Sequence, residues 1–263
     1  HIKGYSDIDL LVICEKYYSY DSASVKQILA SYNTRYSYSQ LSKLRSIDNA
    51  SPYTGNVYDD LRTIRVQSES ILSRKYLKCD ISHPKAIKIT NQDLHRDVDI
   101  VTAGWYDNVN SIINDQNITY RGIQVYDKVA NNRCAADYPF LSIERINTKS
   151  VNTGGRLKRM IRFLKNIKAD SKQKIDLSSF DINAICYNID IDAYKDLHYL
   201  YLVTIVFLQL HKIAYDESYA NSITSVDGKE YIFRGNNKRR EVATMLQNVS
   251  TIYSILKEQH LII

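Results

Sequence analysis

Two aspartates near the start of the chain, Asp7 and Asp9, flank a single apolar residue in the run Ser-Asp-Ile-Asp-Leu-Leu-Val-Ile. Side chains alternate faces along a β-strand, so both carboxylates are expected on one face, with Ile8 and Leu10 pointing into the core. Two carboxylates this close repel each other, and a cation bound between them relieves the repulsion. The motif therefore predicts a divalent metal site, although a solvated strand end gives the same short pattern.

A second pair of carboxylates, Asp97 and Asp99, repeats the pattern in Arg-Asp-Val-Asp-Ile-Val. If the two strands are neighbours in one sheet, Asp7, Asp9 and one acid of the second pair can converge on shared ions. Three carboxylates that hold two magnesium ions form the arrangement used for in-line attack on a nucleoside triphosphate. The alternative for the second pair is the polar face of an edge strand.

A basic amphipathic stretch occupies residues 156–168, with apolar residues at helical spacing and lysine or arginine on the opposite face. A second helix that starts at a serine is predicted directly after it, over residues 179–188. Taken alone, Lys165 is a solvated helix lysine, and Ser178 or Ser179 is an N-cap.

Together these blocks resemble the polymerase-β-like nucleotidyltransferases, most closely the branch of cyclic GMP–AMP synthase, oligoadenylate synthase and their bacterial relatives, the CD-NTases. In that family the Asp-x-Asp strand follows a Gly-Ser turn, and a third carboxylate lies in a later Val-Asp-Val-Val-like strand. The resemblance implies that Asp7, Asp9 and Asp99 are catalytic and hold two Mg²⁺ or Mn²⁺ ions, with Asp99 matching better than Asp97. The Gly-Ser turn that grips the triphosphate is expected upstream of His1, which is not a methionine.

The same resemblance assigns nucleotide binding to Ser6, Lys165, Ser179 and Phe180. In cyclic GMP–AMP synthase-like enzymes a lysine and a serine contact the phosphates, and an aromatic residue stacks on the base. Phe180 stands where the family often has tyrosine, so the stacking surface is kept and a hydroxyl is lost.

The resemblance implies the α+β fold class, with a nucleotidyltransferase sheet core over residues 1–145. A C-terminal helical, nucleotide-binding lobe is expected over residues 146–263, with the active site in the cleft between them. The apolar pattern predicts strands at 5–14, 85–90, 97–103 and 118–125, and helices at 22–47, 57–77, 156–168, 179–188, 194–215 and 238–257. A hairpin turn is predicted at Asp227-Gly228.

The composition of the chain agrees with a nucleotide-binding or a weakly RNA-binding protein and does not decide between them. The net charge of +6 over 263 residues suits a cleft for triphosphates or weak RNA affinity. The four cysteines are far apart, which supports neither a zinc site nor a disulfide framework. A basic cluster, consisting of Arg234, Lys238, Arg239 and Arg240, either reaches a phosphate or an RNA strand or is an exposed helix start.

No signal peptide is visible, and the apolar run at residues 199–210 is too short to cross a bilayer. We therefore expect a cytoplasmic protein with no membrane partner.

Three functions are considered. The first is a metal-dependent synthase that joins nucleoside triphosphates (ATP, with GTP or a pyrimidine triphosphate) into a cyclic or short oligonucleotide messenger for antiphage defence. For this function an RNA or a protein is a candidate activator. The second is a toxin-like transferase that adds nucleotides to an RNA such as tRNA. The third is a non-catalytic nucleotide or RNA sensor of the same fold.

Overall fold

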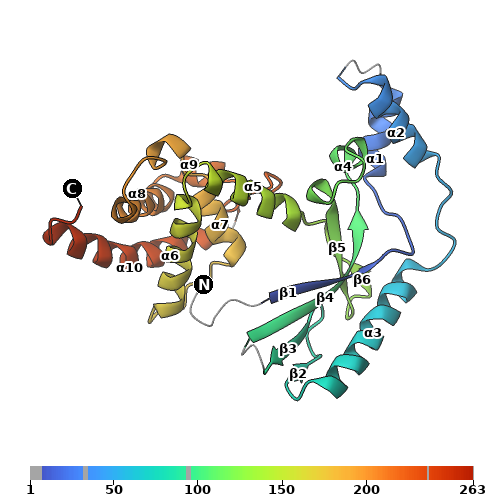
Figure 1. Ribbon diagram of the computed structural model, residues 1–263, viewed down its shortest axis with the longest axis horizontal. Helices are drawn as coiled ribbons and strands as arrows, with labels where there is room; N and C mark the ends of the chain where they lie inside the picture. Colours follow the sequence, from blue (N-terminus) through green and yellow to red (C-terminus); the bar gives the residue numbers. More distant parts are fainter. Residues whose placement is uncertain (1–7, 32–34, 93–95, 236, 263) are drawn as a thin grey trace. The chain divides into compact units, whose positions relative to one another are not determined.

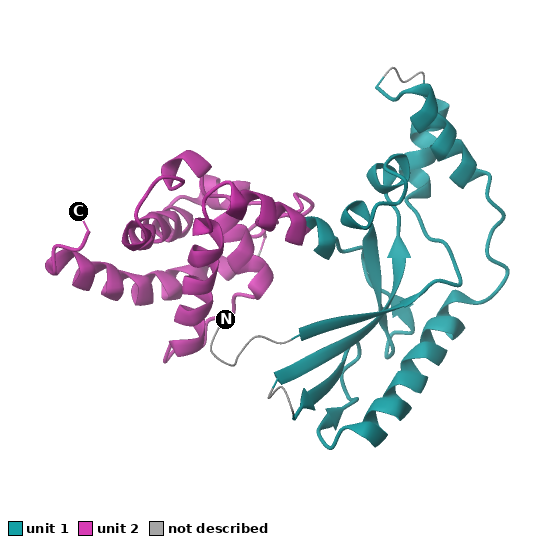
Figure 2. Cartoon of the chain, viewed as in Figure 1, with its two compact units in different colours: residues 1, 3–141 teal, residues 2, 142–263 magenta. Residues whose placement is uncertain are grey.

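The computed structural model of the chain describes residues 8–31, 35–92, 96–235 and 237–262. The chain divides into two compact units after Leu141, inside helix α5 (Pro139–Val151) (Figure 2). In their described parts, the first unit contains the β-sheet and the second unit is helical (Figure 1).

The sheet of the first unit is built around β4 (Arg96–Tyr106). Strand β1 (Ile8–Cys14) runs parallel to β4 along one edge. Because β1 occupies that edge, β3 (Ile87–Asn91) and β5 (Gly122–Asp127) pair antiparallel with successive parts of the other edge. Two short strands extend the sheet from β3 and β5, namely β2 (Cys79–Asp80) and β6 (Asn132–Arg133).

The two faces of β4 have opposite character, as the sequence predicts. Val98 and Ile100 are buried, whereas Asp97 and Asp99 project from the opposite face. Helix α3 (Val57–Lys75) packs on the apolar face, where these two residues join the isoleucines of β3 in one core cluster. The acids of β4 take no part in this core.

The first residues of β1 differ from the prediction. Ile8 and Leu10 are 38% and 51% exposed, rather than buried in the core. Among the described residues β1 pairs only with β4, so it forms an edge of the sheet, and Val12 is its only residue against the core cluster on that face. An edge strand receives less cover than a central one, which accounts for the exposure.

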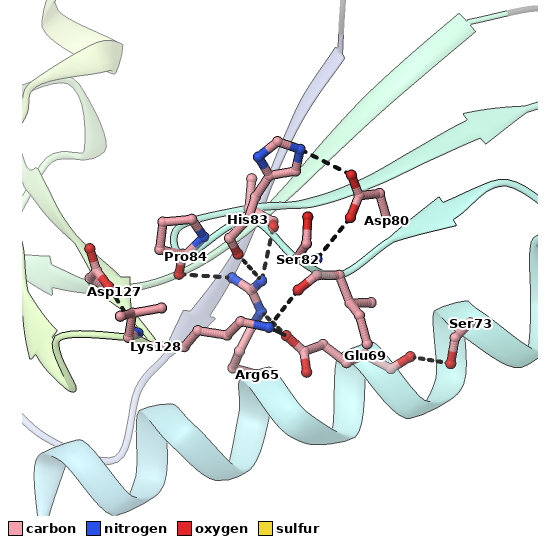
Figure 3. Close-up of polar contacts among 12 residues, drawn as sticks. Arg65, Glu69, Ser73, Asp80, Ser82, His83, Pro84, Asp127 and Lys128 are labelled. Atoms are coloured by element: carbon pink, nitrogen blue, oxygen red, sulfur yellow. Dashed lines mark hydrogen bonds and ion pairs between the residues drawn. The ribbon is translucent and has the colours of Figure 1, made fainter.

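A buried arginine fastens α3 to the loop between β2 and β3 (Figure 3). The Arg65 guanidinium is fully buried and donates to the carbonyl oxygens of His83 (2.7 Å) and Ala86 (2.8 Å). Its Nε donates to Glu69 at 2.8 Å, and Lys128 donates to the same carboxylate at 2.7 Å. The pKa of Glu69 is held below its usual range by these two cations, against the opposing effect of burial. This network fixes where β3 begins.

The helix predicted over residues 22–47 is instead two helices, α1 (Ser22–Ala30) and α2 (Tyr38–Asp48). Ser37 starts α2 with a capping box, in which its hydroxyl accepts from the Gln40 backbone and the Gln40 side chain accepts in return. This capping box is a strong signal for the start of a new helix, so residues 22–47 form two helices instead of one. Both helices pack with α4 (Val109–Ile113) in a separate small core.

The strand predicted over residues 118–125 begins later than expected. Residues Ile118–Tyr120 form a 3₁₀ turn, in which the backbone N–H of Thr119 donates to the Asn117 side chain, and β5 starts only at Gly122. The other predicted strands agree with the structure within a few residues over its described part.

The second unit has one large apolar core shared by its helices. Gly154 and Gly155 lie between α5 and α6 (Arg156–Asp170). Their φ angles of 54° and 84° are in the left-handed region, which glycine adopts more readily than other residues. The helix predicted over residues 194–215 is a 3₁₀ turn at Tyr199–Tyr201 followed by α8 (Leu202–Tyr215). The described part of the unit also contains α7 (Ser179–Tyr187), α9 (Glu217–Ser222), α10 (Lys238–Glu258) and a 3₁₀ turn at Ile191–Ala193.

The turn predicted at Asp227-Gly228 is present, with Gly228 at φ of 73° and a single bridge between Thr224 and Tyr231. Within the described part of the chain, no helix combines the length and apolar content needed to span a bilayer.

Candidate active site

The structure brings two of the three predicted carboxylates together. Asp9 of β1 and Asp99 of β4 are register partners across the parallel pair. Residues paired in this way are about 5 Å apart and project from the same face of a sheet. Oxygen atoms of both side chains can therefore reach one cation, and carboxylate oxygens are the ligands that magnesium prefers.

Asp97 lies on the same face of β4, but its contact is different. The Thr90 hydroxyl of β3 donates to the Asp97 carboxylate at 2.8 Å, directly across the antiparallel pair. Asp99, not Asp97, is the acid opposite Asp9. The register thus pairs Asp9 with the acid that the family resemblance prefers, and the catalytic role of Asp99 stays a prediction.

Ser6 and Asp7 lie outside the described residues, so the geometry of the first carboxylate and of the predicted phosphate contact stays a prediction. Within the described ranges no group of three histidine, cysteine, aspartate or glutamate side chains is arranged to hold a metal ion. The three-carboxylate arrangement consequently depends on Asp7.

A lysine that the sequence analysis did not consider lies beside these acids. Lys88 of β3 is the register partner of Asp99, and its Nζ lies 3.4 Å from Asp99 Oδ2. Both side chains are partly exposed, so the ion pair contributes little to stability, but it places a positive charge on the acidic face. The alternation of Ile87-Lys88-Ile89-Thr90 could have predicted this position, because the isoleucines fix which face the lysine takes.

A pocket of about 410 Å³ adjoins this part of the sheet, and its lining includes Asp80, Lys88, Thr90, Asp97 and Asp99. Asp80 of β2 is the register partner of Lys88, which continues the row of charged residues across the strands. Asp99 is therefore accessible to a ligand from this side.

In the second unit, Lys165 of α6 is half-buried. Burial lowers the pKa of Lys165, and the nearby Lys168 acts in the same direction. Among the described residues no carboxylate forms an ion pair with Lys165, and the one interaction that raises its pKa is with the buried thiol of Cys186. A partly desolvated ammonium without a counter-charge is suited to bind an anion such as phosphate.

The predicted serine and aromatic residue are the first two residues of α7, which packs against α6. Ser178 is the N-cap, and its hydroxyl accepts from the Asp181 backbone at 3.1 Å. The capping role is thus filled by Ser178, and Ser179 is exposed. Phe180 is partly buried against the core of the unit. The expectation that Ser178 or Ser179 is the N-cap is thus confirmed for Ser178, while the role of Ser179 in nucleotide binding stays a prediction.

Comparison with known proteins identifies the family. Residues 144–254 match the protein family described as the cGAS/DncV-like nucleotidyltransferase C-terminal helical domain. A c-di-GMP synthase from Capnocytophaga granulosa is 50% identical over 259 residues, which are 98% of this chain and 74% of that protein.

Solved structures agree with this result. A STING-associated CdnE c-di-GMP synthase from Flavobacteriaceae sp. has a TM-score of 0.85 at 39% identity, covering 97% of this chain and 72% of that one. The CdnE c-UMP-AMP synthase of Rhodothermus marinus, solved with Apcpp and Upnpp, shares the fold at a TM-score of 0.63 and 17% identity, covering 95% and 77%.

The chain therefore belongs to the cGAS/DncV-like nucleotidyltransferases, the CD-NTase family. The predicted α+β fold class, with a sheet core and a C-terminal helical domain, is confirmed. The predicted enzyme class, a nucleotidyltransferase that makes a cyclic or short oligonucleotide messenger, is confirmed as well, and the product class is a cyclic dinucleotide.

Proposed function

We propose that this protein joins two molecules of GTP into cyclic di-GMP and releases two pyrophosphates. Three relatives with identities of 50%, 45% and 40% are named c-di-GMP synthases, which supports guanine as the base. The observation that carries the proposed chemistry is the register pairing of Asp9 with Asp99 on the face of the sheet that lies opposite the buried core.

Enzymes of this family generally depend on metal ions. The donors fit a hard divalent cation, because two carboxylates from adjacent strands project side by side. We assign Asp7, Asp9 and Asp99 to hold two Mg²⁺ or Mn²⁺ ions. When bound, the ions supply a lowered pKa for the attacking ribose hydroxyl and neutralise charge on the leaving pyrophosphate.

The second unit supplies the nucleotide contacts in this proposal. Lys165 and Ser179 bind phosphate oxygens, Phe180 stacks on the base, and Ser6 of the first unit contributes a further phosphate contact. Residues 1–145 accordingly form the catalytic core and residues 146–263 the nucleotide-binding lobe. The half-buried, uncompensated ammonium of Lys165 supports this division of roles.

Replacing Lys165 with methionine is expected to weaken GTP binding about 10- to 150-fold, since a hydrogen bond to a charged group contributes about 1.5–3 kcal/mol. Because burial lowers the pKa of Lys165, its ammonium is lost at a lower pH than that of an exposed lysine. Wild-type affinity should therefore be highest below this lowered pKa and fall as the pH rises through it, whereas K165M should show no such fall. Calorimetric titration with a non-hydrolysable GTP analogue at increasing pH measures both effects.

The matched control for K165M is Lys158→Met, which changes an exposed lysine of the same helix. K158M should bind the analogue as the wild type does. Equal affinity in K165M and K158M would remove Lys165 from the nucleotide site.

The proposed reaction is tested by incubating the full-length protein and Mg²⁺ with labelled GTP, labelled ATP or both, with and without RNA. GTP alone should give a phosphatase-resistant product that co-migrates with cyclic di-GMP. A product formed only when both triphosphates are present would contradict the proposed substrate. Label transferred to the RNA would contradict cyclic dinucleotide synthesis and favour an RNA transferase.

The antiphage role, the cytoplasmic location and an RNA or protein activator all stay predictions; the location is inferred from the absence of a visible signal peptide, and the antiphage role from the resemblance. Measuring the amount of cyclic dinucleotide during phage infection, with and without candidate activators, tests the antiphage role and the activator.

A further inference from the structure

The first turn of α10 contacts the segment that leads into α7. Lys238 belongs to the basic cluster, and its Nζ lies 2.8 Å from Asp181 Oδ1. Asp181 is a residue of α7 and is only 1% exposed, while the lysine side chain is 41% exposed. A carboxylate this deeply buried needs a compensating charge, and the lysine provides it.

The second oxygen of Asp181 holds the start of α7. Asp181 Oδ2 accepts hydrogen bonds from the backbone N–H and the hydroxyl of Ser178, both at 2.8 Å. One carboxylate thus connects the N-cap of α7 with the first turn of α10. Ser179 and Phe180, the residues assigned to the nucleotide, lie between Ser178 and Asp181 in the sequence.

Two further side chains fix the residues just before this cap. Glu241, one turn after Lys238 on α10, accepts a hydrogen bond from the backbone N–H of Asp176 at 2.7 Å. Lys168 of α6 donates to the carbonyl oxygen of Leu177 at 2.7 Å. The segment between α6 and α7 is therefore held from both neighbouring helices up to the residue that precedes Ser178.

The rest of the basic cluster has largely structural contacts too. Arg239 donates to the carbonyl oxygens of Ile213 and Ala214 at the end of α8, and Arg234 donates to that of Asn221. Most of these cations are therefore engaged within the unit, which argues against a free surface that binds RNA. Arg239 thereby ties the start of α10 to the end of α8, and Arg234 ties the segment before α10 to α9.

From these contacts we infer that Lys238 is a positioning residue for nucleotide binding, which acts through Asp181 to hold Ser179 and Phe180 in place. This inference rests on the proposed function, because that function assigns these two residues to the nucleotide.

The test compares Lys238→Met with Arg240→Met, a neighbouring exposed cation in the same turn. Binding of a non-hydrolysable GTP analogue should weaken about tenfold in K238M and stay unchanged in R240M, and Lys238→Arg should restore most of the affinity. In turnover assays K238M should raise KM by a similar factor and leave kcat at saturating GTP nearly unchanged. Mn²⁺ binding should not differ, since the carboxylates of the first unit are untouched.

A double variant covers the case in which K238M does not fold because Asp181 is left unpaired. K238M combined with Asp181→Asn removes both charges, while the amide oxygen can still accept from Ser178. It should fold and bind the analogue as weakly as expected for K238M.

Wild-type affinity in folded K238M, or in the double variant, would overturn the inference. A wild-type protein that binds the analogue but makes no cyclic product would contradict only the proposed reaction. The affinity difference between K238M and R240M would then still decide the role of Lys238.

Discussion

Replacing Asp99 with asparagine should reduce cyclic dinucleotide formation at least about 1,000-fold, which corresponds to about 4 kcal/mol of lost transition-state stabilisation. The amide has nearly the same shape but carries no charge, so the acidic pair with Asp9 loses most of its ability to hold a divalent cation. Asp9→Asn should have the same effect for the same reason. Rates of product formation, measured by chromatography at saturating GTP and Mg²⁺, give the comparison.

Asp97→Asn is the matched control, because Asp97 lies two residues earlier on the same face of the same strand. Its carboxylate accepts from Thr90 and is not opposite Asp9, so activity should remain within about threefold of the wild type. The reverse result, an active D99N and an inactive D97N, would make Asp97 the third carboxylate.

Replacing Arg65 with methionine should lower the free energy of unfolding by about 3–5 kcal/mol, because it removes one partner of a buried ion pair. The carbonyl oxygens of His83 and Ala86 would lose their donor, and Glu69 would keep only Lys128. Urea unfolding followed by circular dichroism measures the change, with the wild type at the same pH.

Arg62→Met, on an exposed position of the same helix, should change the unfolding free energy by no more than about 0.5 kcal/mol. An R65M variant as stable as R62M would show that the buried guanidinium does not anchor the loop between β2 and β3.

The sheet core could be predicted because its signals are local and repeated. The alternation of acids and apolar residues in β4 set both its strand character and its faces, and α3 was visible from helical spacing. The division of the first helical stretch was missed, since a capping box at Ser37 outweighs a weak periodic pattern. The burial of β1 was overestimated, because a sequence does not show which strand forms an edge.

The site was predictable to the extent that its residues carry a family motif. Asp9 and Asp99 could be paired only by assuming that their strands are neighbours, and the register supports that assumption. Lys88 was missed because it reaches Asp99 across strands rather than along the chain. The contact of Lys238 with Asp181 joins residues 57 positions apart, and an ion pair over that sequence separation leaves no local signal.

The measurement that tests the central claim most directly is a crystal structure with Mn²⁺ and a non-hydrolysable GTP analogue, with the metal located by anomalous scattering. The account predicts manganese within about 2.2 Å of carboxylate oxygens from both Asp9 and Asp99. Nucleotide phosphates bound with manganese coordinated elsewhere, and no metal between these two side chains, would contradict it.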